Sequence, residues 1–200
     1  MESLFPQESF SGIRHPETEK AQKYALLNVF DASGIVGFAR GLDSLGYRIL
    51  VTQNTTRILT DENISFEQVD RLSLPIMGGI LYDRNDPRQQ EEAKKLGFRP
   101  INVVACSLPP LFPTSKDSDL KIDQSLGEIE IDVFVALRAA AKNHQHVLPI
   151  VDPTDYDEVV DALRNNRDNI LLRRGLALKV FRYFAEYHSL IARQLKIARI

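Results

Sequence analysis

Lys142, Asn143 and His144 form the densest group of chemically useful side chains in this 200-residue chain. They follow Arg138 and three alanines, which favour a helix, and they precede the apolar run 147–151, which predicts a strand. A cation, an amide and an imidazole can stabilise negative charge and move protons. Connections between elements often hold such groups, so this helix-to-strand junction is a candidate site. Alternatively, Lys142 and His144 only balance the dipole at the helix end.

The elements that must position this junction alternate between strands and helices. Residues 24–30 predict a strand, 35–45 a helix with one apolar face, and 47–51 a second strand. This order favours an α/β fold with a mostly parallel sheet and right-handed crossovers. Further strands are expected at 64–69 and 101–106, and further helices at 57–61, 86–96, 152–163 and 169–198, the last as one helix or two.

Two connections could contact a ligand. Thr52-Gln-Asn-Thr55 begins a strand-to-helix turn, where α/β sheets often bind anions, but the turn lacks glycine and its threonines could instead cap the helix. Residues 70–79 contain Pro75 and the pair Gly78 and Gly79, which predicts a loop with backbone freedom.

The composition limits the class of protein. A hydrophobic content of 44% suits one domain, with residues 1–22 as a mobile arm and 23–200 as the folded part. No run is apolar enough to span a bilayer and no signal peptide is evident, so we expect a cytoplasmic protein. The single cysteine, Cys106, predicts a buried strand thiol rather than a nucleophile. A net charge of −2 gives no support for nucleic-acid binding, and we expect neither metal nor cofactor.

Four stretches of the chain form a recognisable set: Ala25-Leu-Leu-Asn-Val-Phe-Asp31 with Gly34, Arg138-Ala-Ala-Ala-Lys-Asn-His144, Val151-Asp-Pro-Thr-Asp-Tyr156, and Leu172-Arg-Arg-Gly-Leu-Ala-Leu-Lys-Val-Phe181. Together they resemble the IMP cyclohydrolase domain, the amino-terminal half of a bifunctional purine enzyme that also carries a formyl transferase. The resemblance implies a methylglyoxal-synthase-like three-layer fold with a C-terminal helical extension, a homodimer, and closure of a formamido-imidazole-carboxamide ribotide to IMP with loss of water. The chain is expected to end before any formyl transferase domain.

The chain also departs from the family pattern. The family's D-K-T-G is Asp31-Ala-Ser-Gly34, its phosphate-binding S-T-G-G-T is Val51-Thr-Gln-Asn-Thr55, and its G-R-V-K-T-L-H-P is shortened to Asp70-Arg-Leu-Ser-Leu-Pro75. The tyrosine of N-L-Y-P-F falls at Pro109, and the aspartate of I-D-I-G-G falls at Glu130. Losing two glycines and a lysine removes space and positive charge for a phosphate, so we expect a ligand without one.

The resemblance implies a site as well as a fold. The catalytic residues would be Lys142, which would stabilise an oxyanion, Glu130 in place of the family aspartate, Asp132 as a possible base, and Asn143. The residues that would bind substrate are Thr52, Gln53, Asn54, Thr55, Arg71, Gly78, Gly79 and Arg138.

Three functions are compatible with these residues. The first is a cyclohydrolase-like enzyme acting on a small heterocyclic carboxamide or formamide, favoured by the intact stretch 138–144. The second is a non-catalytic ligand-binding or dimerisation module, favoured by the number of replaced groups. The third is an ordinary IMP cyclohydrolase with altered phosphate contacts.

Overall fold

The fold is built on a five-stranded sheet whose paired strands are all parallel, in the order β3-β2-β1-β4-β5. The computed structural model describes residues 22–69, 72–109, 126–127 and 130–197, and within α2 it describes Gln53 and Asn54 by their backbone alone. The strands are β1 (Lys23–Asn28), β2 (Tyr47–Val51), β3 (Glu67–Gln68), β4 (Ile101–Cys106) and β5 (Leu148–Ile150). The predicted mostly parallel sheet is confirmed. The predicted arm, residues 1–22, lies almost wholly outside the described residues.

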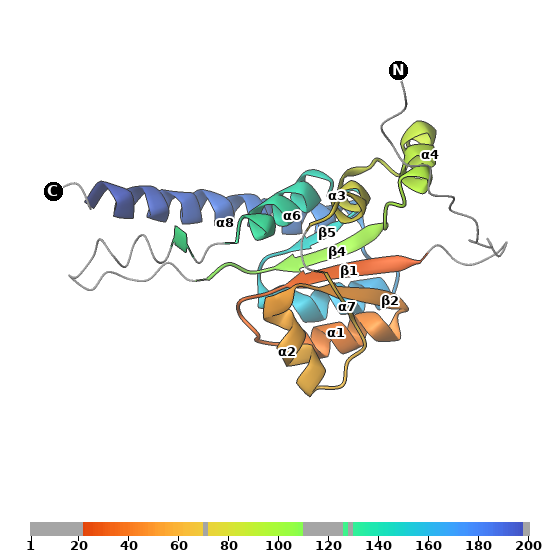
Figure 1. Ribbon diagram of the computed structural model, residues 1–200, viewed down its shortest axis with the longest axis horizontal. Coiled ribbons are helices and arrows are strands. Elements are labelled where there is room, and N and C mark those ends of the chain that lie inside the picture. The colour runs from red at the N-terminus through yellow and green to blue at the C-terminus, as the bar shows by residue number, and fades with distance from the viewer. Residues whose placement is uncertain (1–21, 70–71, 110–125, 128–129, 198–200) are drawn as a thin grey trace, which may run out of the picture.

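Helices cover both faces of the sheet and make three layers (Figure 1). One face carries α1 (Ile35–Ser44), α2 (Gln53–Asp61) and α7 (Tyr156–Arg164), and the other carries α3 (Leu74–Leu81), α6 (Ile131–Lys142) and α8 (Ile170–Ile197). A short helix, α4 (Pro87–Lys95), leads into β4, and a 3-10 turn, Pro153–Asp155, precedes α7. The C-terminal extension is a single helix, α8, that projects beyond the sheet.

Two apolar clusters form the core, one on each face of the sheet. Because successive strand side chains point to opposite faces, Leu26 of β1 packs in the cluster under α3 and α6, whereas Leu27 packs in the cluster under α1 and α7. Strands buried on both faces explain the continuous apolar runs in the sequence. None of the helices among the described residues combines the length and the apolar composition needed to cross a bilayer.

Residues 74–81 form a helix, so the predicted loop over 70–79 is wrong in its second half. Pro75 is tolerated because it occupies the first helical turn. The two glycines allow close packing rather than backbone freedom: a Cβ at Gly78 would lie 2.4 Å from the Phe98 ring, and one at Gly79 would lie 1.6 Å from the Arg99 carbonyl oxygen. Both glycines therefore place α3 against the segment that enters β4.

Two predicted boundaries also shift. The strand expected over 64–69 is reduced to β3, which pairs only with β2 at the edge of the sheet. The helix expected from residue 57 begins at Gln53, one turn earlier. In this turn Thr55 and Thr56 both donate their backbone N–H groups to the Thr52 carbonyl oxygen, which starts the helix directly after β2.

Candidate functional site

The carboxyl edge of the sheet contains the point at which the strand order reverses. From β1 the chain passes to β2 on one side, and β4 later pairs with β1 on the other side. Ligands of open α/β sheets bind in the crevice outside the strand ends at such a point. In Figure 1 this edge lies on the left, where β1 and β4 end and α6 begins.

A buried amide and a carboxylate meet in this crevice. Asn28 ends β1 and is only 4% exposed. Its Nδ2 donates a hydrogen bond of 3.0 Å to Oε2 of Glu130, the residue that precedes α6. The Glu130 side chain makes no capping bond to its own helix, so its carboxylate is directed to the end of β1. Asp132 lies in the first turn of α6 and is exposed. Both carboxylates lie near the positive end of the helix dipole.

Hydroxyl groups hold the adjacent loops in place. Oγ of Ser107, directly after β4, accepts hydrogen bonds from the backbone N–H groups of Phe30 (2.8 Å) and Asp31 (3.0 Å). Oγ1 of Thr55, which is fully buried, accepts one from the N–H of Val29 at 3.0 Å. These contacts fix the turn after β1 against its neighbours on both sides. Neither Ser107 nor Asn28 was singled out from the sequence, because a lone serine or asparagine after a strand carries no periodic signal.

Thr52 provides a polar atom at the start of α2. Its side chain makes no capping bond, and its Oγ1 is buried without a hydrogen-bond partner among the described residues. The capping alternative for this threonine therefore does not hold, and Thr55 bonds to Val29 instead of to its own helix. The N–H groups of Thr55 and Thr56 donate to the Thr52 carbonyl oxygen, so in the first turn of α2 it is the N–H groups of Gln53 and Asn54 that helix geometry leaves for a ligand atom.

Lys142 and Asn143 lie at the opposite edge of the sheet. The helix α6 returns from the carboxyl edge to the amino edge, and the twelve-residue step from Glu130 to Lys142 spans about 18 Å along its axis. Lys142 is exposed, and Nδ1 of His144 lies 3.2 Å from the Ala141 carbonyl oxygen. Within one chain the structure therefore does not bring Lys142 to Glu130.

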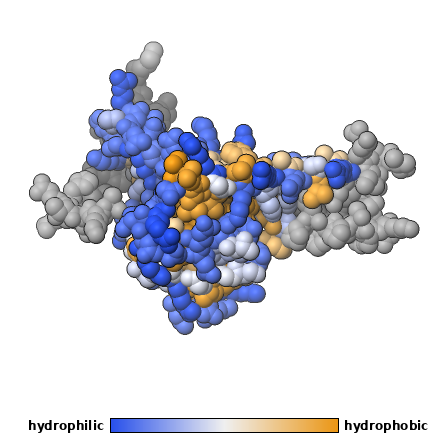
Figure 2. Space-filling model, turned by 180° about the vertical axis from the view of Figure 1, so that it is seen from behind, coloured by the Kyte–Doolittle hydropathy of each residue, from blue (hydrophilic) through white to orange (hydrophobic). Residues whose placement is uncertain are grey.

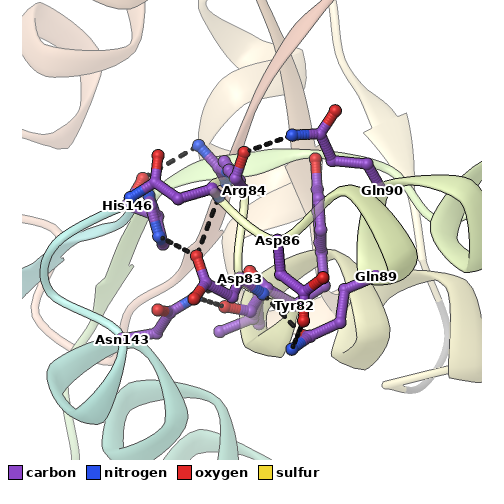
Figure 3. A network of polar contacts seen from close by, with 10 residues as sticks. Tyr82, Asp83, Arg84, Asp86, Gln89, Gln90, Asn143 and His146 are labelled. Atoms are coloured by element: carbon purple, nitrogen blue, oxygen red, sulfur yellow. Dashed lines mark hydrogen bonds and ion pairs between the residues drawn. The ribbon is translucent and has the colours of Figure 1, made fainter.

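Asn143 has a structural partner at that edge. Its Nδ2 donates to the carbonyl oxygens of Ile80 (2.7 Å) and Tyr82 (3.2 Å), and it thereby caps the end of α3 (Figure 3). Beside it the buried guanidinium of Arg84 donates to the carbonyl oxygens of Ile101 (2.5 Å) and His146 (2.9 Å). Burial lowers the pKa of Arg84. These contacts fasten the amino ends of β4 and β5 to α3.

The remaining predicted ligand contacts are dispersed. Arg138 is exposed on the outer side of α6, and Gly78 and Gly79 are packed against neighbouring residues as described above. Arg71 lies outside the described residues. The backbone of Gln53 and Asn54 begins α2 at the carboxyl edge, next to Thr52. The structure thus brings together the residues predicted at the turn after β2 and, near the end of β1, Glu130.

Cys106 is a buried strand thiol, as predicted. It ends β4 and is 2% exposed. Burial raises the pKa of its thiol to about 12, so it stays protonated near neutral pH and does not act as a thiolate nucleophile. The described residues contain no group of three or more His, Cys, Asp or Glu side chains arranged to hold a metal ion.

Comparisons with known proteins point to one group of enzymes. Residues 140–199 match the family described as AICARFT/IMPCHase bienzyme. The chain is 37% identical over 188 residues to the bifunctional purine biosynthesis protein PurH of Staphylococcus aureus strain Newman, and equally to that of strain USA300. Each alignment covers 87% of this chain and 38% of the relative, so the chain spans about two fifths of these curated relatives. The crystal structure of ForH is similar with a TM-score of 0.79 and 28% identity, covering 87% of this chain and 99% of ForH.

Proposed function

Because the chain is an IMP-cyclohydrolase-like domain with a methylglyoxal-synthase-like fold, we propose that it is an enzyme of ring closure with loss of water. Its substrate would be a small heterocyclic carboxamide or formamide that carries no phosphate. The names of the relatives imply this type of activity, whereas this chain has different residues in the crevice. A cytoplasmic location remains a prediction from the sequence.

The Glu130 carboxylate is the observation that carries this proposal. It occupies the position of the family aspartate, and the buried Asn28 holds it at the strand edge where α/β enzymes bind ligands. Ring closure requires the carboxamide nitrogen to attack the formyl carbon and to lose a proton, after which the former formyl oxygen leaves as water. A carboxylate fixed within hydrogen-bond reach of that nitrogen would accept the proton, and as an acid it would then protonate the departing oxygen. Asp132, two residues further along α6, is the second candidate base.

The turn after β2 supports a substrate without phosphate. The structure begins α2 at Gln53, so Gln53 and Asn54 occupy the first helical turn where the family has glycines. Any residue other than glycine at these positions carries a side chain, which reduces the room for an anion beside the backbone N–H groups. The family lysine in the turn after β1 is Ala32, which supplies no compensating charge. We propose that these N–H groups and the Thr52 hydroxyl bind a neutral carbonyl oxygen of the substrate.

Lys142 could take part in this reaction only if a second subunit supplied it. Because it lies about 18 Å along α6 from Glu130, it would stabilise the oxyanion in this crevice only when a second subunit presents it. A homodimer is compatible with the relationship to PurH, and we propose one. Without such an arrangement, the N–H groups of Gln53 and Asn54 at the start of α2 would stabilise the oxyanion.

The test compares two substrates and one substitution. Ring closure is followed by absorbance with formamido-imidazole-carboxamide as the riboside and as the 5′-phosphorylated ribotide. We expect turnover of the riboside, and we expect Glu130→Gln, which keeps an acceptor for Asn28, to lower kcat about 100-fold. Glu62→Gln, an exposed carboxylate on the far side of α2, is the control and should leave kcat unchanged.

Each other outcome identifies an alternative. Efficient closure of the ribotide, or micromolar binding of IMP through residues 52–55, would show an ordinary IMP cyclohydrolase. Absence of turnover with both substrates, in protein whose fold is verified, would favour a ligand-binding or dimerisation module. The placement of Lys142 and Asn143 at the amino edge is the observation in favour of that module.

A further inference from the structure

A second cavity lies beside the crevice, on its β5 side. Its volume is about 760 Å³, which is within the range of small-molecule sites. Three loops that follow β1, β4 and β5 form its floor, and α8 forms its wall. Its lining does not include the catalytic and substrate-binding residues predicted from the sequence, but it does include Ser107 of the crevice and Ala32, where the family has its lysine.

The apolar part of the lining suits a flat ligand. Phe30 is 57% exposed and faces this cavity together with the ring of Tyr183. Leu108, Val151 and Pro153 complete the apolar surface. An exposed phenyl ring at the end of a buried strand gains free energy when another apolar surface covers it. This lining therefore favours an aromatic ring.

The charges of the lining are unequal. Among the described residues, three carboxylates, Asp31, Asp152 and Glu186, face the cavity with two cations, Lys179 and Arg182. The ammonium group of Lys179 is already paired with Asp155, a carboxylate behind the wall that is only 4% exposed. The Asp155 carboxylate offsets the charge of Lys179, so Arg182 is the cation left to balance the carboxylates of the described lining. An anionic ligand would be repelled, and a cation would be attracted.

Two of the carboxylates are held in fixed positions. The N–H of Ser33 donates to Asp31 Oδ1 and the N–H of Thr154 donates to Asp152 Oδ1, both at 2.9 Å. These contacts with Ser33 and Thr154 lower the pKa of both aspartates, so both are charged near neutral pH. Each carboxylate sits at the start of a turn that follows a rigid strand, which reduces the entropy lost when a ligand binds.

We propose that this cavity binds a planar aromatic cation, such as an amidine or a protonated amino-heterocycle. The ring packs between Phe30 and Tyr183, and the cationic N–H groups donate to Asp31 and Asp152. The side chains that bind this cation are not those proposed to perform ring closure, although Ser107 holds the turn that carries Phe30 and Asp31. Probe binding and ring closure are measured separately, so failure of one does not decide the other.

Three probes of nearly equal shape test the charge preference: benzamidine, benzamide and benzoate. Their dissociation constants are measured by titration calorimetry with the full chain at physiological ionic strength. We expect benzamidine to bind at least about fivefold more tightly than neutral benzamide, and benzoate to bind most weakly. Benzoate binding that equals or exceeds benzamidine binding would overturn the proposal.

Substitutions that remove either a negative or a positive charge from the lining locate the site. Asp31→Asn and Asp152→Asn retain the Oδ1 acceptor of each turn, and each should weaken benzamidine binding about five- to tenfold. Arg182→Gln removes an exposed cation of the lining and should strengthen binding, a change that a damaged fold would not produce. Asp43→Asn, an exposed carboxylate in α1, is the control. Unchanged affinity in both aspartate variants, or an equal loss in Asp43→Asn, would refute the site.

Discussion

At the scale of single residues, the pair of Asp155 and Lys179 shows how a buried charge is tolerated. The side chain of Asp155 is 5% exposed, whereas that of Lys179 is 49% exposed, and the ammonium group reaches inward to the carboxylate. The hydrogen bond from Lys179 to Asp155 raises the pKa of the lysine. A carboxylate withdrawn from water is costly unless it is paired, so this contact helps to hold α8 against the turn before α7.

Lys179→Met should lower the free energy of unfolding by about 1–2 kcal/mol, less than for a fully buried pair because the lysine is half exposed. The double variant Asp155→Asn with Lys179→Met should recover part of that loss, since no buried charge is left unpaired. The measurement is urea unfolding at pH 7. Equal stability of the wild type and the single variant would contradict this account.

The same pair predicts a dependence on pH. Because the folded pKa of Lys179 is raised, its contribution to stability is fully present below the unfolded value of about 10.4 and is lost as the pH rises through the folded pKa. The difference in stability between wild type and Lys179→Met should therefore be constant through neutral pH and should shrink in alkaline solution.

At the scale of elements, α3 depends on its close approach to the segment before β4. At Gly79 a methyl group would collide with backbone rather than with a movable side chain. At Gly175 in α8, by contrast, nothing lies within 4 Å of an added Cβ. The two helical glycines thus form a matched pair in which only the surroundings differ.

Gly79→Ala should destabilise the fold by about 3 kcal/mol, since α3 must move away from Arg99. Gly175→Ala should stabilise it by about 1 kcal/mol through helix propensity alone. Thermal unfolding of the two variants and the wild type shows whether each substitution lowers or raises the stability of the fold. A neutral Gly79→Ala would show that α3 is free to shift.

At the scale of the whole molecule, α8 and α6 expose apolar side chains that a monomer leaves in water. Figure 2 shows hydrophobic atoms in the middle of the rear face and along the projecting helix. Leu178 is 49% exposed and Phe181 is 42% exposed on α8, and Ile131 is 74% exposed on α6. Exposed apolar surface of this kind is typical of an interaction site, which fits the proposed homodimer.

Phe181→Glu should therefore shift the protein from dimer to monomer in sedimentation velocity at micromolar concentration, because the buried charge would oppose association. Leu96→Glu, at the end of α4, is 46% exposed in the wild type and is the matched control. If the wild-type protein sediments as a monomer, there is no second subunit to bring Lys142 to the crevice, and the proposed role of Lys142 is wrong.

Much of the fold was determined by local sequence. The strands at 47–51 and 101–106 agree with their predicted bounds, and the helices predicted over 35–45 and 86–96 begin at Ile35 and Pro87. These positions follow from the sequence because apolar periodicity and the capping residues act within a few residues. The end of α1 at Ser44 is likewise set locally, because Gly46, two residues later, has a φ of 78° in the left-handed region. Short sequence motifs also indicated the family.

The tertiary structure decided which of the suggestive residues lie together. Lys142 and Glu130 belong to one stretch of sequence, yet a straight helix places them at opposite edges of the sheet. Asn28, Ser107 and Glu130 are distant in sequence, yet parallel strands bring their carboxyl ends to one crevice. The glycines of α3 suggested a loop because the residues that require them, Phe98 and Arg99, follow some twenty positions later. Local patterns encode elements, whereas contacts between distant residues arise only when those elements pack.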